Sequence, residues 1–410
     1  DAAIDLRTTV NYLALEVTGA ARGDVSIVET DSIRLASSDQ GAETIRTTNG
    51  DLRVTAGGAI TVIGSIETSG DLIELTAGET ITISGDINSE GGDVVLAGSN
   101  SVVVDSGAII DAGTGTILFD AGGGNVDTSG GTLSSDSTGI GLQIENASEV
   151  LLGDVFVTAG TVQLGIGRNI SGLIDQAAGT TINTQTLSIS TAGAVQLANA
   201  ANQIESVGEI SAAGDVVLAT SVDLFTVQSL LSDAGAVDLV NHSGGIDLVS
   251  VTALDGVILA LAEGTITARS VTAAKQDIRL EAVGQQSDIL VGQVTAGEGG
   301  DVTLIAGDDV LALDDSIVNV TADDLLITAG NGTADQDAAI DLRTTVNDLA
   351  LEVTGTARGD VSIVETDSIR LASSDQGAET IRTTNGDLRV TAGGAIEVIG
   401  SIETSGDQIE

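Results

Sequence analysis

The residues of this chain that could bind a ligand are mostly aspartates, and they recur in one short pattern. Blocks of the form Gly-Asp-apolar-x-apolar recur along the chain, for example at residues 50–54, 70–75, 92–96, 214–218 and 300–304. If these blocks align in successive turns of a repeating fold, the carboxylates of Asp51, Asp71 and Asp93 lie about 5 Å apart. Ca²⁺ prefers several carboxylate and carbonyl oxygens as ligands, so such a row is a candidate calcium site.

A second acidic group lies nearer the carboxyl end of the chain. The candidate calcium ligands in this group are Asp308, Asp309, Asp323 and Asp324. Carboxylates this close together repel one another unless a cation or a donor neutralises them. The alternative interpretation is a solvated acidic face, or aspartates that accept hydrogen bonds from turn N–H groups. The sequence contains no array of Gly-Gly-x-Gly-x-Asp nonapeptides, which would favour calcium.

One tripeptide could act in adhesion. Arg22-Gly23-Asp24 has the integrin-type sequence, and Arg358-Gly359-Asp360 repeats it. The functional interpretation is receptor binding through an exposed loop. The alternative is that Gly-Asp opens a turn of the fold here, as it does in the blocks above, and that the arginine only precedes it.

The composition argues against catalysis. The chain has no Cys, so it forms no disulfide, thiolate zinc site or thiolate nucleophile. The single histidine, His242, cannot build a multi-histidine metal site and is expected in an exposed turn. Paired carboxylates could hydrolyse a glycan, but sugar sites usually add aromatic and basic groups, and the chain has four aromatics and 14 bases. We expect no enzyme activity and, apart from Ca²⁺, no cofactor.

Charge and hydrophobicity limit the partners. The 410 residues include 60 acids against 14 bases, a net charge of −46, which repels nucleic acid and anionic membrane. Every apolar run is shorter than 18 residues, so no membrane insertion is expected. The sequence starts at Asp1 without the pattern of a signal peptide. A hydrophobic fraction of 42% argues against disorder.

Above these short blocks lies a long repeat. Residues 1–74 recur as residues 337–410, and the two copies differ at only four positions: Tyr12/Asp348, Ala20/Thr356, Thr61/Glu397 and Leu72/Gln408. The sequence therefore predicts one complete unit, 1–336, and the start of a second, 337–410. The pattern is interrupted at both ends of the sequence, so we expect terminal coils with apolar edges and either a longer chain or subunits that join end to end.

A finer period predicts the fold. The Gly-Asp blocks and their variants lie mostly 20 to 24 residues apart, separated by short segments in which apolar and polar residues alternate. Such segments, bounded by Gly, Asn, Asp and Ser, are typical of β-strands. Two or three strands per 20–24 residues predict an all-β solenoid of about 18 or 19 coils. The absence of Pro fits strands that pair on both sides.

The alternation also predicts which side chains face the core. The residues expected to be buried are Leu52, Val54, Ile60, Val62, Ile66, Ile73, Leu75, Ile81, Ile83, Ile87, Val94, Leu96, Val102 and Val104. The residues expected to be exposed are Arg53, Thr61, Glu67, Glu74 and Thr82. In the same register the four differences between the copies fall on outward or turn positions, where Asp, Glu and Gln cost little.

The repeated blocks resemble a known family. Gly92-Asp93-Val94-Val95-Leu96-Ala97-Gly98 and Gly57-Gly58-Ala59-Ile60-Thr61-Val62 look like segments of the filamentous-haemagglutinin-like large exoproteins of Gram-negative bacteria. The resemblance extends over nearly the whole chain and is carried by many short blocks, without a single diagnostic motif. It implies a right-handed parallel β-helix, export from the cell, and adhesive or fibre-forming roles. The family has no shared catalytic residues to transfer.

These observations predict a structural role. We expect a segment of an extracellular β-solenoid at a bacterial surface that forms a stiff fibre or stalk by stacking on itself, head-to-tail or laterally. The first alternative is an adhesin stalk whose flank binds a glycan or receptor, with residues 125–195, where the period is weaker, as its site. The second is a β-helix enzyme that degrades polysaccharides, which would need a cleft of clustered carboxylates and bases.

Overall fold

The described residues of the computed structural model are 4–19, 22–37, 44–297, 299–330, 338–355, 357, 359–374, 380–405 and 408–410. Within these ranges the regular secondary structure consists of strands, from β1 (Ile4–Thr8) to β45 (Ser401–Thr404), and contains no helix. The strands pair in parallel and stack as a β-solenoid of about 18 turns. The predicted fold class is therefore confirmed. Among the described residues no helix is long and apolar enough to cross a membrane.

The chain divides into two compact units, residues 1–204 and 205–410. This division reflects spatial contacts. It leaves the boundary between sequence repeats at 336/337, which lies outside the described residues, as a prediction.

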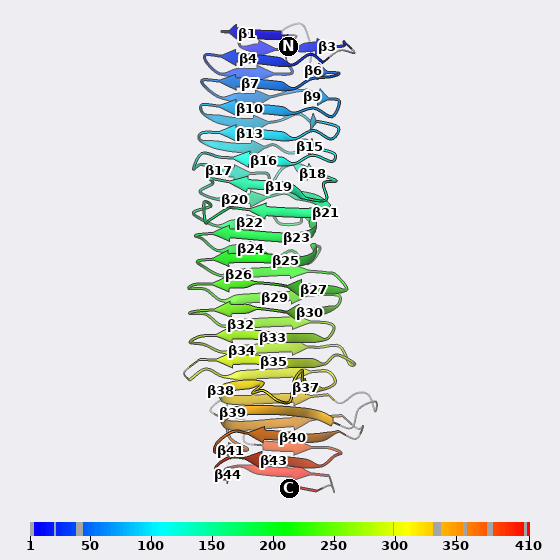
Figure 1. The fold of residues 1–410 in the computed structure, drawn as a ribbon, viewed down its shortest axis with the longest axis vertical. Coiled ribbons are helices and arrows are strands. Elements are labelled where there is room, and N and C mark those ends of the chain that lie inside the picture. The colour runs from blue at the N-terminus through cyan, green and yellow to red at the C-terminus, as the bar shows by residue number, and fades with distance from the viewer. Residues whose placement is uncertain are drawn as a thin grey trace. The chain divides into compact units, whose positions relative to one another are not determined.

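In unit 1 each coil contributes up to three short strands. The coil of β7 (Leu52–Ala56), β8 (Ile60–Val62) and β9 (Ser65–Thr68) pairs with that of β10 (Ile73–Ala77), β11 (Thr80–Ile83) and β12 (Ile87–Asn88). The next coil is β13 (Val94–Gly98), β14 (Ser101–Val104) and β15 (Ile109–Asp111). Figure 1 shows these strands as successive rungs. Each strand joins the strand one coil away in the sequence, as a solenoid requires.

The core of this region is the predicted one. All fourteen side chains expected inside are buried, the most exposed being Val104 at 2%. Of the five expected to be exposed, Arg53 is exposed, whereas the prediction is wrong for Thr61, Glu67, Glu74 and Thr82, which are half-buried. The reason is that parallel coils lie only about 4.8 Å apart, so an outward side chain is flanked by its counterparts in both neighbouring coils.

One corner of the coil requires glycine. Gly50 has φ +140°, and a Cβ on it would lie 2.5 Å from the carbonyl carbon of Gly23 in the coil before. The hydroxyl of Thr47 donates to the Gly50 carbonyl at 3.0 Å. The second copy repeats this corner, with Gly386 at φ +142°. The glycines of the Gly-Asp blocks at 50 and 386 thus allow two coils to approach closely.

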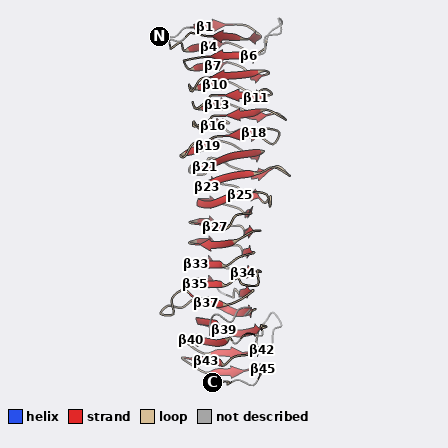
Figure 2. Cartoon of the chain, turned by 90° about the vertical axis from the view of Figure 1, so that its right-hand side faces the viewer, coloured by secondary structure: helices blue, strands red, loops and turns tan. Residues whose placement is uncertain are grey.

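Unit 2 contains the junction between the sequence repeats. β38 (Val320–Ala329) pairs in parallel with β39 (Ala338–Val353), from Val320–Thr344 to Ala329–Val353. β39 in turn pairs with β40 (Asp360–Glu365), β41 (Ile369–Leu371) and β42 (Thr380–Thr383) of the second copy. In Figure 1 β39 is one long strand within this stack, and Figure 2 shows β40 and β42 next to it. The first coil of the second copy therefore continues the ladder of the preceding repeat.

The two copies show what stacking contributes to burial. Leu6 is 47% exposed in the first copy, while its equivalent Leu342, which has a described coil on each side, is 1% exposed. The opposite holds later in the copies, where Ile60 is 0% and its equivalent Ile396 is 46% exposed. Because the local sequences are nearly identical, the neighbouring coil accounts for the difference.

Candidate functional site

The aspartates of the Gly-Asp blocks connect neighbouring coils. Asp93 Oδ1 accepts a hydrogen bond from the N–H of Thr116 at 2.8 Å, and Asp215 Oδ1 accepts one from Ala236 at 2.8 Å. Asp154, in the block at residues 153–157, makes the same bond to Thr181 at 2.7 Å. In each case the donor lies just before the corresponding strand of the next coil. These carboxylates satisfy backbone donors at strand starts, which gives them a structural role without a cation.

The predicted row of Asp51, Asp71 and Asp93 is wrong in register. Asp51 Oδ1 accepts from the N–H of Leu72 at 3.4 Å, whereas Asp71 Oδ2 accepts from Gly50 at 2.9 Å. Because Ile73 aligns with Leu52 and Val94, it is Leu72, and not Asp71, that lies level with the other two aspartates. The block at 70–75 has one extra residue before its first inward side chain, and this shifts Asp71 by one position.

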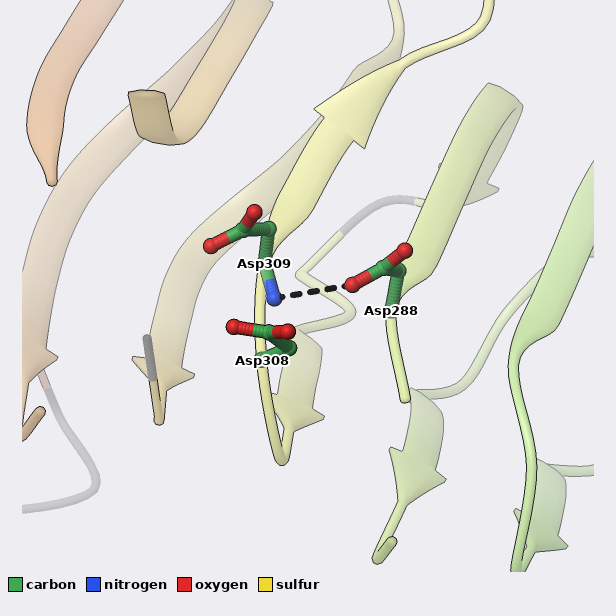
Figure 3. Close-up of side chains that lie close together, drawn as sticks. All are labelled: Asp288, Asp308 and Asp309. Atoms are coloured by element: carbon green, nitrogen blue, oxygen red, sulfur yellow. Dashed lines mark hydrogen bonds between the residues drawn. The ribbon is translucent and has the colours of Figure 1, made fainter. Parts of the chain in front are cut away.

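A compact acidic cluster forms instead in unit 2. One carboxylate oxygen from each of Asp288, Asp308 and Asp309 lies within 4.8 Å of the others. Asp308 is 4% and Asp309 2% exposed, and Asp288 is half-buried. The N–H of Asp309 donates to Asp288 Oδ1 at 3.2 Å, as Figure 3 shows. Asp288 precedes β35 (Ile289–Ala296), and the other two precede β37 (Val310–Ala312), which pairs with it.

This cluster contains two of the predicted calcium ligands and one that was missed. The signal for Asp288 was available, because it lies 21 residues before Asp309, one coil away. Asp323 and Asp324 do not belong to this cluster. Asp323 accepts from the side-chain amide of Asn347 at 2.6 Å, and the N–H of Asp324 donates to Asp301. Three carboxylates in a half-closed setting fit the oxygen chemistry of Ca²⁺, and calcium binding stays a prediction.

The adhesion-type tripeptide of the first copy is part of the coil. Gly23 is buried and donates to the carbonyl of Asn49 at 2.7 Å. Asp24 Oδ1 accepts from the N–H of Asp51 at 3.1 Å and lies 3.2 Å from the Arg22 Nε. These contacts hold the pKa of Asp24 below its ordinary value, chiefly through the backbone bond. The tripeptide is therefore engaged with the next coil and with itself.

The second tripeptide has the same backbone contacts where it is described. Gly359 donates to the carbonyl of Asn385 at 2.8 Å, and Asp360 Oδ1 accepts from Asp387 at 2.9 Å. Arg358 lies outside the described residues. Receptor binding by either tripeptide stays a prediction.

A buried glutamate in each copy was not anticipated. Glu29 accepts from the Thr8 hydroxyl at 2.7 Å and from the N–H groups of Val10 and Thr30, both at 2.8 Å. Glu365 has the equivalent partners, with Thr344 at 2.9 Å, and both glutamates are 2% exposed. Glu29 is in phase with the inward side chains of Val25 and Ile27, which could have identified it as an inward acid.

The pKa values of the two glutamates are shifted in opposite directions. Burial opposes ionisation of Glu29, but its hydrogen bonds outweigh burial and hold its pKa below the ordinary value. Burial raises the pKa of Glu365 despite the same donors. The physical difference lies in the preceding coil. β39, which precedes Glu365, is itself covered by β37 and β38, whereas β1, which precedes Glu29, has a described coil on one side only. Identical hydrogen bonds thus coexist with different desolvation.

Arginines of the repeated segment face acids of neighbouring coils. Arg53 Nε lies 3.1 Å from Glu74, and Arg46 Nε lies 3.8 Å from Glu67. In the second copy Arg382 Nη1 lies 3.3 Å from Glu352. All three arginine side chains are about half exposed. Exposed pairs of this kind contribute little stability individually, roughly 0–1 kcal/mol.

The region predicted to bind a partner contains an open hollow. A cavity of about 290 Å³ lies on β17 (Asn125–Asp127), β20 (Val150–Leu152) and β22 (Ile174–Gln176). Its charged lining is acidic and consists of Asp127, Glu149 and Asp175. His242, as expected, is an exposed residue in a bend after β29 (Val237–Asn241).

A row of outward threonines was also missed. Thr252, Thr272, Thr295, Thr321 and Thr345 align in register on consecutive coils of unit 2. The Thr345 hydroxyl lies 2.7 Å from that of Thr366. The signal in the sequence is the tripeptide Val-Thr-Ala, which recurs at 251, 271, 294 and 320.

The chain has no match among known proteins in any of three comparisons. No family model, no curated protein and no solved structure is similar to it at a significant level.

Proposed function

We propose that this chain is a structural, self-stacking segment of a fibre or stalk. The observation that supports this most is the repeat junction, where β39 of the second copy continues the parallel ladder of β38. A fold in which each coil buries the apolar edge of the next can be extended by adding copies. The proposal assigns no catalytic step to the chain.

The mechanism we propose is mechanical. Backbone hydrogen bonds between consecutive coils resist bending and shear, and the aspartates at strand starts add side-chain bonds to this ladder. The net charge of −46 keeps the outside hydrated and makes separate stacks repel one another. Screening by salt or divalent cations would then control lateral association.

We place this role at a bacterial cell surface or outside the cell. The support is the resemblance of the Gly-Asp-Val and Ala-Ile-x-Val blocks to large exoproteins of Gram-negative bacteria. A parallel β-solenoid agrees with that resemblance. Secretion of the tagged chain by a Gram-negative host, tested by protease accessibility on intact cells, would distinguish surface display from retention.

Concatemers of residues 1–336 test the stacking role. Each added unit should lengthen particles seen by electron microscopy by a constant ~70 Å, since about 15 coils rise about 4.8 Å each. Chains of one, two and three units give the slope. Separate beads joined at variable angles, or no regular increment, would refute the proposal.

A binding flank is the second candidate function. The hollow at Asp127, Leu151 and Asp175 would suit a cationic group on an apolar stem, because acids surround its leucine. Binding of lysine-rich peptides that is lost in the double variant Asp127→Asn/Asp175→Asn would favour this function. Equal binding by the wild type and this variant would argue against the hollow as a site.

A further inference from the structure

The differences between the two copies are concentrated around one arginine. Residues 1–74 and 337–410 differ at four positions, and one of these, Ala20/Thr356, lies outside the described residues. Of the other three, two lie on either side of the same arginine in the ladder. Arg34 is level with Tyr12 and Thr61, and its equivalent Arg370 is level with Asp348 and Glu397.

The first copy holds this arginine with an aromatic ring. Arg34 Nη1 donates to the Tyr12 hydroxyl at 3.1 Å, and its guanidinium carbon lies 5.5 Å from the ring centroid. The neighbour on the other side, Thr61, is neutral. This is a cation–π contact supported by a hydrogen bond.

The second copy holds the same arginine with acids. Arg370 Nη2 donates to Asp348 Oδ2, and Glu397 lies opposite it in the next coil. Asp348 was expected on the outside, where an acid costs little, but its side chain is only 5% exposed. The reason is that Asp324 of the preceding coil and Arg370 of the following coil flank it. Its Oδ1 is buried without a hydrogen bond, so Arg370 is the cation that compensates it.

We propose that positions 12/348 and 61/397, acting through Arg34/Arg370, form a copy-specific pairing key between three successive coils. The partner that this key recognises is the neighbouring coil of the same copy. A coil taken from the other copy has the same backbone register and the same core. It would, however, align residues of both copies at the three positions, for example a tyrosine, an arginine and a glutamate; we call this a mixed column. This inference rests on the proposed stacking role, for which nearly identical copies must avoid exchanging coils.

The mixed columns are disfavoured because one guanidinium serves both neighbours. With Tyr at 348 and Glu397 kept, the carboxylate draws Arg370 away from the ring, and the cation–π contact is lost. With Thr also at 397, the guanidinium returns to the ring, as it does in the first copy. The effect of the first substitution therefore depends on the second.

A double-mutant cycle in the whole chain tests the key. The variants are Asp348→Tyr, Glu397→Thr and the double variant, with Gln408→Leu as a matched control, because it restores a first-copy residue away from the arginine. Native-state hydrogen exchange of the β41 and β44 (Ile396–Val398) amides reports local opening. We expect the double variant to open at least about threefold less than the product of the single effects predicts. The control should leave these amides unchanged.

The proposal is overturned if local opening in the double variant equals the product of the two single effects. It is also overturned if Gln408→Leu couples to Asp348→Tyr as strongly as Glu397→Thr does. If Asp348→Tyr prevents folding of its coil, the reciprocal cycle Tyr12→Asp and Thr61→Glu in the first copy decides, because Tyr12 is 38% exposed and tolerates replacement. Additivity there would also overturn it. The length increments of the concatemers do not depend on this arginine, so failure of the key leaves the stacking role standing.

Discussion

Truncation of one leucine in each copy separates the contribution of stacking from that of local sequence. Leu342 is 1% exposed and pairs with Ile363, while Leu6 is 47% exposed and pairs with the equivalent Ile27. Replacing a buried leucine by alanine costs about 2–5 kcal/mol, including the cavity that remains. Leu6 has lost only part of its contact with water and would leave no closed cavity, so Leu6→Ala should cost about 1 kcal/mol. The predicted difference is therefore about 1–4 kcal/mol, at least about fivefold in local opening.

Hydrogen exchange is the appropriate assay, since a repeat array does not unfold as two states. The amides of β4 (Val25–Glu29) and β40 report the two sites separately in a single sample. Sedimentation at the same concentration must show monomers, so that self-association does not cover Leu6. Equal losses in monomeric variants would refute the claim that the neighbouring coil, and not the local sequence, buries these positions.

Three further predictions concern charge. Carboxyl NMR should show a higher pKa for Glu365 than for Glu29: the contribution of Glu29 to stability is lost as pH falls through its lowered pKa, and that of Glu365 is lost as pH rises through its raised pKa. The reverse order would contradict our account of burial. Asp154→Ala should destabilise its coil by about 1 kcal/mol by leaving the Thr181 N–H without its acceptor, whereas Asp154→Asn should cost less; equal effects would show that charge, not acceptance, matters. Calorimetry should detect Ca²⁺ binding that weakens in Asp309→Asn, and a thermal melt that is identical in low salt, chelator and millimolar Ca²⁺ would count against any role for cations.

The fold was largely predictable because its signal is local and repeated. Alternation alone placed residues such as Leu52, Ile60 and Ile73 in the core, and a register error of one residue would have exposed all of them. The degree of exposure was harder to predict. Glu74 faces outward yet is half-buried, because the coils on either side determine how much water reaches it.

The candidate sites were less predictable because they depend on register between coils. Coil lengths vary, so counting residues placed Asp71 level with Asp51 when it is one position away. Asp288 was missed for a different reason: it lies one coil of 21 residues before Asp309, but it follows Ser287 and is not part of a Gly-Asp block. Asp348 was expected outside because alternation within its own strand places it there. It is buried because Asp324 of the preceding coil lies level with it, and alternation within one strand cannot show that contact.

Disulfide trapping across the repeat junction tests the central claim most directly, since the chain has no native cysteine. Thr321 and Thr345 are outward partners in register between β38 and β39, at a separation that a disulfide spans. Thr321→Cys/Thr345→Cys should form an intramolecular disulfide in nearly all monomers under mild oxidation. Thr321→Cys/Glu352→Cys, seven residues further along β39, should not. Efficient trapping of the second pair, or none of the first, would contradict a continuous ladder from one repeat into the next.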